Sequence, residues 1–186
     1  MSEKVVLERD DVRRTLQRIA HEIAEKNPDP EGLAIVGIHT RGALLARRLH
    51  TLLGELTAVE LPIGDVDISF YRDDVGAKAP GAQPVVHASH IDFDLTGRTV
   101  VLVDDVLFTG RTVRAAIEAV FDYGRPQRVQ LAVLCDRGHR ELPFRPDYVG
   151  KNLPTAREER VNVRLEEVDG TDEVTISDPS PVEVSP

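Results

Sequence analysis

The order of apolar and polar residues predicts a chain that alternates between strands and helices. Continuous apolar runs, such as LAIVGI at residues 33–38, are typical of strands buried on both faces of a parallel sheet. Apolar residues spaced three or four positions apart instead predict helices that bury one face. The expected strands are residues 33–38, 58–62, 66–71, 85–90, 99–105 and 128–136, and the expected helices are 10–26, 43–53 and 111–124. Strands joined through helices form parallel sheets, so we predict an α/β fold with one parallel sheet covered on both faces.

The first predicted helix, residues 10–26, has recognisable ends. Its apolar face is formed by residues at i, i+4, i+7, i+8 and i+11, which are Val12, Leu16, Ile19, Ala20 and Ile23. Asp10 or Asp11 is expected to cap the start of the helix, because a carboxylate there accepts hydrogen bonds from free backbone amides. Asn27-Pro28 is expected to end it, since proline cannot continue a helix.

The chain length of 186 residues fits one domain, because domains cluster at roughly 100–150 residues and are seldom divided below about 250. We therefore expect a single domain over residues 1–177. Residues 178–186 contain three prolines and show no apolar period, which predicts a disordered tail. The polar stretch at residues 73–84 is too long for a tight turn and predicts a mobile loop.

Charge is unevenly distributed along the chain. Lysine and arginine number 23 against 32 aspartate and glutamate residues, which gives a net charge of −9. Residues 165–186 contain seven of these acids and no lysine or arginine, so residues 1–164 hold 25 acids against 23 bases, a net charge of −2. The overall charge therefore does not exclude a nucleic-acid partner, since such binding depends on where basic residues gather.

The single cysteine, Cys135, excludes an intramolecular disulfide and favours a reducing compartment. It lies in an apolar strand, so we expect a buried structural residue. No apolar run approaches the about 18–20 residues of a membrane span, and the first residues do not resemble a secretion signal. These features predict a cytoplasmic protein with no membrane partner.

The most informative segment is an acidic pair at a strand end followed by a Thr-Gly-Arg-Thr turn into a helix. Asp104 and Asp105 end the apolar run TVVLVDD, and ligands of open α/β sheets lie at such strand ends. The free backbone amides of residues 109–112 and the helix dipole favour a phosphate. Two carboxylates beside a phosphate would face sugar hydroxyls, so the pattern favours a ribose 5-phosphate. The alternative interpretation of the two acids is a solvated turn or a metal-binding pair.

Residues 100–112, VVLVDDVLFTGRT, resemble the phosphoribosyl pyrophosphate (PRPP) motif of type I phosphoribosyltransferases. Further matching segments are RIAHEI at 18–23, TRG at 40–42, DISFYRDD at 67–74 and CDRGHRELPFRPDYVGKNLPT at 135–155. Together they are similar to the PyrR family of pyrimidine operon regulators, which are also uracil phosphoribosyltransferases. The resemblance runs in register from about residue 5 to residue 177.

This resemblance implies a type I phosphoribosyltransferase-like parallel sheet flanked by helices, with a small hood over the active site and a flexible lid hairpin. It implies the reaction of uracil with PRPP to give UMP and pyrophosphate, with Mg²⁺ held mainly through PRPP and by no direct protein ligand. The residues that it assigns to catalysis are Asp104, Asp105 and Arg72. The residues that it assigns to substrate binding are Thr40, Arg41, Gly42, Val106, Thr109, Gly110, Arg111, Thr112 and Arg137.

The resemblance also gives roles to three loops. Residues 40–42 would bind pyrophosphate, for which the alternative is a plain turn with a solvated Arg41, and the neighbouring His39 is expected to be incidental. Arg72 would contact pyrophosphate from the lid, for which the alternative is a solvated hairpin charge. Residues 136–148 would form the hood and recognise uracil through backbone groups.

Basic residues gather on one face of the first predicted helix. Arg14, Arg18 and His21 recur at i, i+4 and i+7, opposite the apolar face, and a solvated polar face is the ordinary interpretation of such a stripe. The resemblance instead implies a surface on a homodimer or higher homo-oligomer that binds a hairpin in pyrimidine-operon messenger RNA, with UMP or UTP as the controlling nucleotide. The residues that it adds to this surface are His139, Arg140, Arg145 and Lys151.

Two residues depart from the pattern of the family. Phe108 stands where members usually carry tyrosine, and because the backbone supplies most of the phosphate site we expect activity to survive. Gln17 replaces a small hydroxyl residue beside the basic stripe and is expected to alter RNA binding. Two other functions stay open at this point: an RNA-binding regulator whose site mainly senses nucleotides, and a salvage phosphoribosyltransferase without an RNA function.

Overall fold

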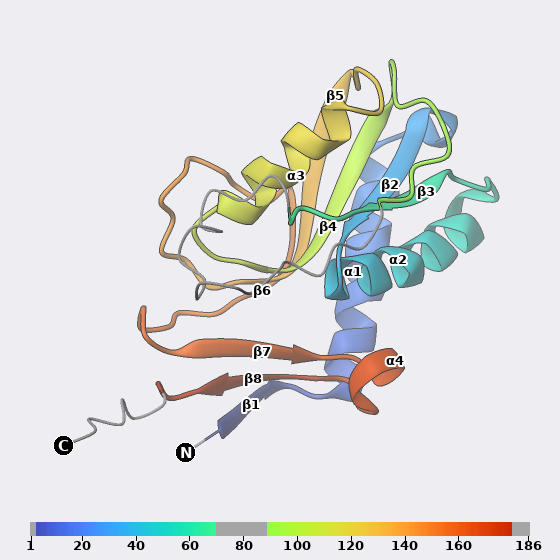
Figure 1. Ribbon diagram of the computed structural model, residues 1–186. Coiled ribbons are helices and arrows are strands. Elements are labelled where there is room, and N and C mark those ends of the chain that lie inside the picture. The colour runs from blue at the N-terminus through green and yellow to red at the C-terminus, as the bar shows by residue number, and fades with distance from the viewer. Residues whose placement is uncertain (1–2, 70–88, 180–186) are drawn as a thin grey trace.

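The structure, a computed structural model, describes residues 3–69 and 89–179. Its centre is a five-stranded parallel sheet in the order β3-β2-β4-β5-β6 (Figure 1). The strands are β2 (Leu33–Ile38), β3 (Ile63–Val66), β4 (Thr99–Leu107), β5 (Arg128–Asp136) and β6 (Tyr148–Asn152). The predicted α/β fold with a parallel sheet is therefore confirmed.

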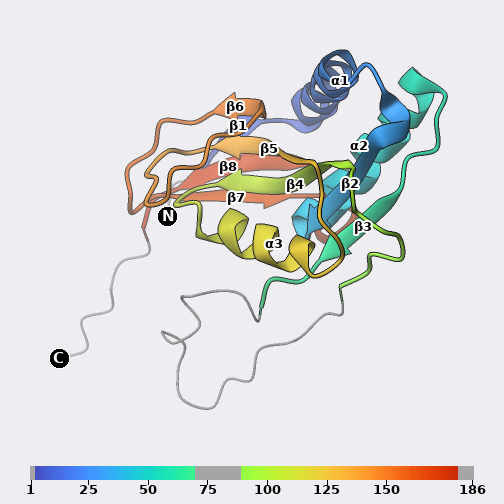
Figure 2. The ribbon, with the colours of Figure 1, turned by 90° about the horizontal axis from the view of Figure 1, so that it is seen from above.

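Helices cover both faces of this sheet (Figure 2). They are α1 (Arg9–Lys26) and α2 (Arg41–Thr57) on one face and α3 (Arg111–Phe121) on the other. Alternate residues of β4 follow the same division: Val101 and Val103 pack with α1 and α2, whereas Val100 and Leu102 pack with α3. A strand covered on both faces needs apolar residues at every position, which explains the continuous apolar runs of β2 and β4.

A second, smaller sheet lies at the end of the large sheet where β4 finishes (Figure 1). Its antiparallel strands, in the order β1-β8-β7, are β1 (Glu3–Leu7), β8 (Glu173–Ser177) and β7 (Arg160–Arg164). The short helix α4 (Glu166–Asp169) connects β7 to β8. The expected hood segment, residues 136–148, follows β5 as predicted and forms mainly the connection between β5 and β6. The small separate layer is built from the two ends of the described chain.

The predicted helices occur, with different ends. The helix expected at residues 10–26 ends at Asn27 as predicted, but its cap is Glu8, and Asp11 Oδ2 accepts a hydrogen bond from the Glu8 amide at 3.0 Å. Asp11, one of the two acids expected to cap, thus lies at the third position of the helix, and its side chain bonds back to the capping residue. The helix expected at 43–53 extends over the whole of α2, and that expected at 111–124 ends three residues earlier. Among the described residues, no helix has the length and apolar character to cross a membrane.

The strand predictions are right in the centre of the sheet and wrong at its edge. The strands expected at 33–38 and 128–136 are confirmed at both ends, and that expected at 99–105 continues to Leu107. No strand forms at 58–62, where α2 ends in a left-handed residue, and β3 shares only Val66 with the strand expected at 66–71. Of the strand expected at 85–90, the described part contributes one isolated bridge between His90 and Asp65.

Several predicted features lie outside the described residues. They are the first residues of the chain, the lid with Arg72, the loop at 73–84, most of the strand expected at 85–90, and residues 180–186 of the expected tail. The division into one domain and a tail therefore stays a prediction.

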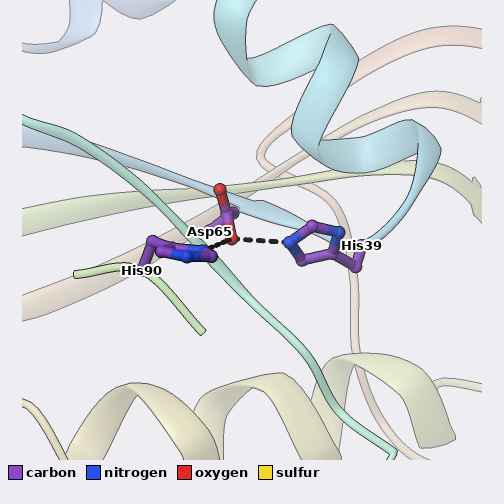
Figure 3. Close-up of side chains that lie close together, drawn as sticks. All are labelled: His39, Asp65 and His90. Atoms are coloured by element: carbon purple, nitrogen blue, oxygen red, sulfur yellow. Dashed lines mark hydrogen bonds and ion pairs between the residues drawn. The ribbon is translucent and has the colours of Figure 1, made fainter. Parts of the chain in front are cut away.

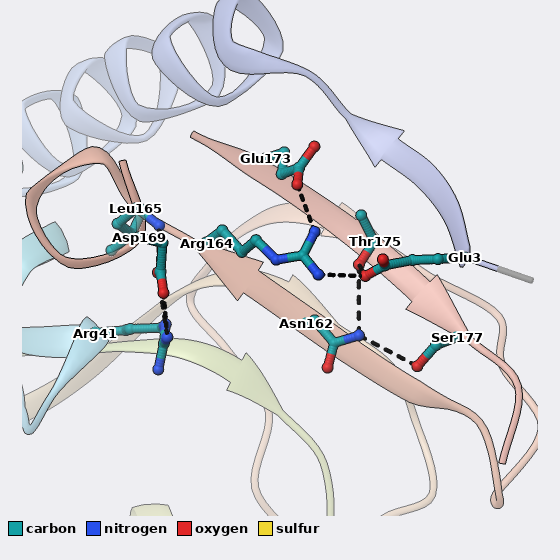
Figure 4. Close-up of polar contacts among 9 residues, drawn as sticks. All are labelled: Glu3, Arg41, Asn162, Arg164, Leu165, Asp169, Glu173, Thr175 and Ser177. Atoms are coloured by element: carbon teal, nitrogen blue, oxygen red, sulfur yellow. Dashed lines mark hydrogen bonds and ion pairs between the residues drawn. The ribbon is translucent and has the colours of Figure 1, made fainter. Parts of the chain in front are cut away.

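Arginines of α2 fasten the small sheet to the large one. Arg48 binds Glu167 through Nε and Nη2, at 2.9 and 2.6 Å, and binds Asp172 through Nη1 and Nη2, at 2.9 and 2.7 Å. Arg41 Nη2 donates to Asp169 Oδ1 at 3.0 Å (Figure 4). Two-pronged pairs of this kind fix orientation as well as distance, so they set how α4 lies against α2.

A polar network also crosses the small sheet (Figure 4). Arg164 donates to Glu3 on β1 and to Glu173 on β8, and Thr175 donates to the same Glu3 carboxylate. Asn162 Nδ2 donates to Ser177 Oγ at 3.2 Å. Ionic and polar side chains therefore join all three strands across one face, which explains why this sheet lacks the apolar signature of the large one.

The ion pairs of Arg48 predict a loss of stability in acid. Hydrogen bonds from Arg48 lower the pKa of Glu167; burial raises the pKa of Asp172, but hydrogen bonds from Arg48 and the Glu166 amide outweigh it and lower that pKa. Carboxyls whose pKa is lowered by folding stabilise the fold above their unfolded values of about 4, and this contribution is lost as the pH falls through the folded values. Urea unfolding should therefore give a lower stability at about pH 3 than at about pH 7.

Replacing Arg48 with methionine should remove part of this dependence. Arg48→Met is expected to cost about 2 kcal/mol at about pH 7, below the about 3–5 kcal/mol of a fully buried pair, because these groups are partly exposed. The matched control is Arg47→Met, which replaces an exposed arginine on the same helix. It should change the free energy of unfolding by less than about 0.5 kcal/mol. If Arg48→Met loses as much stability between about pH 7 and about pH 3 as the unchanged protein does, the acid sensitivity does not come from these ion pairs.

Candidate active site

Asp104 and Asp105 lie at the carboxyl end of β4, the central strand of the large sheet. Asp104 is buried and Asp105 is half-buried. Asp104 Oδ1 accepts a hydrogen bond from the Asp105 amide at 2.9 Å, and Asp105 Oδ1 accepts one from the Val106 amide at 2.8 Å. Each carboxylate is therefore oriented by the backbone amide of the residue that follows it.

A pocket of about 300 Å³ continues from these acids to the start of α3. Its walls are formed by Asp104, Val106, Leu107, Phe108, Thr109, Gly110, Arg111, Thr112 and Val113. Gly110 has a φ of 93°, a left-handed conformation that glycine adopts without strain, and it directly precedes the first helical residue. The backbone amides at the start of α3, of which that of Arg111 donates to Thr109 Oγ1 at 3.3 Å, therefore border a concave site that suits a phosphate.

The start of α2 approaches the same acids from β2. A Cβ added to Gly42 would lie 2.5 Å from the Val103 carbonyl oxygen and 3.3 Å from Asp104 Oδ1. Gly42 therefore brings the backbone of Thr40 and Arg41 against the end of β4. The Arg41 side chain itself is half-exposed and binds Asp169, so in this structure it is held by α4.

The comparisons with known proteins agree with this geometry. The family model described as a phosphoribosyl transferase domain matches residues 6–167. A protein of Roseiflexus sp. (strain RS-1) named Bifunctional protein PyrR is 60% identical, over 91% of this chain and 92% of the relative. A protein of Deinococcus radiodurans with the same name is 59% identical over 94% of each chain. The chain belongs to the PyrR family.

Solved structures place the PyrR fold among other phosphoribosyltransferases. The hypoxanthine phosphoribosyltransferase of Trypanosoma cruzi matches with a TM-score of 0.70 and 20% identity, over 95% of this chain and 97% of that one. The corresponding enzyme of Staphylococcus aureus matches with a TM-score of 0.67 and 19% identity, over 96% and 93%. At these identities the similarity shows a shared fold. The expected type I phosphoribosyltransferase fold is therefore confirmed.

Beside the pocket at the start of α3, Arg137 packs against Phe108. Arg137 is buried, its Cζ lies 4.1 Å from the centre of the Phe108 ring, and burial lowers the pKa of its guanidinium. Its Nη2 donates to the carbonyl oxygens of Ala156 and Arg157, at 3.0 and 3.1 Å. Phe108, the departure from the family's tyrosine, thus supplies a ring face to a cation and needs no hydroxyl for this contact.

Sequence analysis missed Glu141, which orients the expected substrate-binding residue Arg111. Glu141 Oε2 accepts from Arg111 Nε at 2.9 Å, and its other oxygen accepts from Arg157. These two arginines hold the pKa of Glu141 below its usual range. The only sequence signal was an acid among the basic residues of the 136–148 segment, and nothing in the spacing indicated its partners.

The residues assigned to RNA binding fall into two groups in the structure. Arg18 Nη2 donates to the Gly150 carbonyl at 2.6 Å, Arg14 pairs with Asp11 at 2.8 Å, and Lys151 donates to the Val6 carbonyl at 3.0 Å. These three exposed cations therefore belong to one face, formed by α1 and β6. His21 lies exposed on α1 and belongs to the same helical stripe.

The other assigned residues lie on the connection between β5 and β6. Arg140 donates to Asp136 and to the carbonyls of Phe108 and Phe144, and a ring nitrogen of His139 lies 2.7 Å from the Thr155 carbonyl oxygen. Arg145 is exposed on the same connection. Arg140 thus fastens this connection to the loop between β4 and α3, and His139 fastens it to the segment after β6. Cys135, just before it, is buried as expected, and burial raises the pKa of its thiol to about 12.

The close packing at Gly42 predicts a site that tolerates no added methyl group there. Gly42→Ala would drive a Cβ into the Val103 carbonyl, so the start of α2 must shift, at a cost of about 1–3 kcal/mol. Gly54→Ala is the matched control, because a Cβ at Gly54 in the same helix would meet its nearest atom at 3.8 Å. Removing glycine from a helix there should raise stability by about 0.5–1 kcal/mol. Urea unfolding of both variants tests this, and equal effects would refute it.

Proposed function

We propose that this chain transfers the 5-phosphoribosyl group of PRPP to uracil, giving UMP and pyrophosphate. The observation that carries the proposal is the position of Asp104 and Asp105 directly before the phosphate pocket of residues 106–113. The 5-phosphate would occupy the pocket at the start of α3, and the two carboxylates would accept hydrogen bonds from ribose hydroxyls. Family membership supports uracil as the base, since the relatives carry the name Bifunctional protein PyrR.

In this reaction the bond between the anomeric carbon and pyrophosphate breaks while the bond to a uracil nitrogen forms, and the proton of that nitrogen is lost to the leaving pyrophosphate or to water. Positive charge develops on the ribose as pyrophosphate leaves, and the adjacent acids stabilise it. The backbone and hydroxyl of Thr40, with Arg41 and Gly42, would hold the departing pyrophosphate, for which Arg41 must exchange its contact with Asp169. Arg72, which lies outside the described residues, is proposed as the further contact from the lid. Catalysis then consists of orientation and charge stabilisation without a protein nucleophile.

Mg²⁺ fits the donors present at this edge. Asp104 and Asp105 offer oxygen atoms, the ligands that Mg²⁺ prefers, but each already accepts a backbone amide. We propose that they hold the ion through water and through the ribose, with PRPP supplying most of its ligands. The chemistry that bound Mg²⁺ supplies is neutralisation of the charge on the leaving pyrophosphate.

The enzymatic proposal predicts product from uracil and a strong effect of Asp105→Asn. Purified protein with PRPP and Mg²⁺ should convert uracil to UMP and leave hypoxanthine unreacted. Asp105→Asn should lower kcat/KM by about 10²-fold while retaining thermal stability, because the amide oxygen can still accept from Val106. Asp94→Asn, a remote turn residue, is the control and should keep full activity. No UMP from the unchanged protein would falsify the proposal.

We also propose that the face formed by α1 and β6 binds a hairpin of pyrimidine-operon messenger RNA and that UMP raises the affinity. The observation that favours this second function is the gathering of Arg14, Arg18 and Lys151 on one exposed face, despite the net charge of −9. UTP is a further proposed controlling nucleotide. We propose that the protein acts in the cytoplasm, as a homodimer or a higher homo-oligomer.

The RNA proposal predicts a charge-dependent loss in the double variant Arg14→Ala/Lys151→Ala. Its affinity for a leader hairpin should fall, and the salt dependence should weaken by about 0.7 in log–log slope for each lost phosphate contact. Arg125→Ala, which removes an exposed cation between α3 and β5, is the control and should bind as the unchanged protein. Fluorescence anisotropy at several salt concentrations, with and without UMP, measures both effects. Equal binding to a scrambled RNA, or none, would remove this function.

A further inference from the structure

Two histidines and an aspartate converge at the edge of the large sheet, beside the start of α2 (Figure 3). His39 Nε2 lies 2.6 Å from Asp65 Oδ1, and His90 Nδ1 lies 3.3 Å from the same oxygen. One ligand atom from each residue lies within 4.8 Å of the other two. The side chains of Asp65 and His39 are mostly buried, whereas that of His90 is 65% exposed. The cluster is therefore held by the fold and open to solvent on one side.

The backbone holds the three residues in place without help from their side chains. His90 and Asp65 exchange both of their backbone hydrogen bonds, at 3.0 and 2.9 Å, so their side chains project from directly opposite positions. The His39 amide donates to the Val66 carbonyl at 3.0 Å, which fixes His39 beside β3. Gly64 permits the close approach, because a Cβ there would lie 2.6 Å from the His90 carbonyl oxygen. Such preorganisation is what a binding site requires.

Two imidazoles and one carboxylate form a donor set suited to transition metals. Neutral imidazole nitrogens suit Zn²⁺, Co²⁺, Ni²⁺ and Fe²⁺, whereas Mg²⁺ and Ca²⁺ prefer sites made only of oxygen. In tetrahedral Zn²⁺ sites the ligand atoms lie about 3.3 Å apart, given metal–ligand distances of about 2.0–2.1 Å. The contact between His90 and Asp65 already has this length, and that between His39 and Asp65 needs to open by less than about 1 Å.

We propose that His39, Asp65 and His90 form a binding site for one divalent transition-metal ion, of which Zn²⁺ is the representative. The two imidazoles bind through Nε2 of His39 and Nδ1 of His90, and the carboxylate binds through Asp65. Its two imidazole nitrogens distinguish this site from Asp104 and Asp105, whose side chains offer only oxygen atoms as ligands. Because His39 lies in the connection between β2 and α2, an ion here ties the start of α2 to β3 and to residue 90.

The test is metal binding by the full chain, read out without any activity assay. Protein freed of metal with a chelator is titrated with Co²⁺, followed by visible absorption, and with Zn²⁺, followed by calorimetry. We expect saturable binding of one ion per chain, a ligand-field spectrum with nitrogen and oxygen donors, and a rise in Tm with Zn²⁺. An excess of Mg²⁺ should not displace the bound ion.

Variants assign the binding to these three residues. His90→Ala alters an exposed side chain, so the protein should fold, and it should bind Zn²⁺ about tenfold or more weakly. Asp65→Asn keeps the shape of the side chain but loses its charge and should weaken binding similarly. His21→Ala, which removes an exposed histidine of α1, is the matched control and should bind as the unchanged protein. No saturable binding, displacement by Mg²⁺, or unchanged affinity in both His90→Ala and Asp65→Asn would overturn the proposal.

Discussion

The close contact of the first turn of α2 with β2 and β4 is the constraint on which the rest of the site depends. A Cβ at Gly37 would lie 2.4 Å from the Ala43 Cα, and one at Gly42 would lie 2.5 Å from the Val103 carbonyl oxygen. Helix and strands therefore meet backbone to backbone. This contact brings the loop before α2 to the acids at the end of β4, and it leaves Arg41 and Arg48 on the side that faces α4.

The acid-rich final part of the sequence has a structural purpose in this arrangement. Its carboxylates pair with arginines of other elements: Glu167 and Asp172 with Arg48, Asp169 with Arg41, and Glu173 with Arg164. Much of the negative charge that seemed to oppose an RNA partner is thus neutralised locally. Arg14 and Arg18 pair with acids of α1 itself, Asp11 and Glu22, and Lys151 donates to the Val6 carbonyl, so these cations take no part in those pairs.

The sequence permitted prediction of those parts whose determinants are local. Strands β2 and β5 were located at both ends, because β2 is buried and apolar throughout and β5 has a buried apolar run, Leu131–Cys135, between polar ends. The residues that line the pocket at the start of α3 could also be singled out, since β4, its loop and the start of α3 are contiguous, and their binding of phosphate stays a prediction. Strands β7 and β8 were not, because their stability comes from cross-strand polar pairs such as that of Arg164 with Glu173. The contact of Arg48 with Asp172 joins residues 124 positions apart, and no spacing rule indicates it. No spacing rule indicates the cluster around Asp65 either, because His39, Asp65 and His90 lie on three separate segments.

The small sheet joins the two ends of the described chain, and this has a consequence for synthesis on the ribosome. In the order β1-β8-β7, the first strand to be made has β8 as its neighbour, and β8 is the last strand of the described chain. All strands of the parallel sheet emerge before β8 does. The nascent chain can therefore assemble its nucleotide-binding half while β1 still lacks its neighbour. Translation must pass residues 167–177 before Arg48 and Arg41 find their acids and β1 pairs with β8.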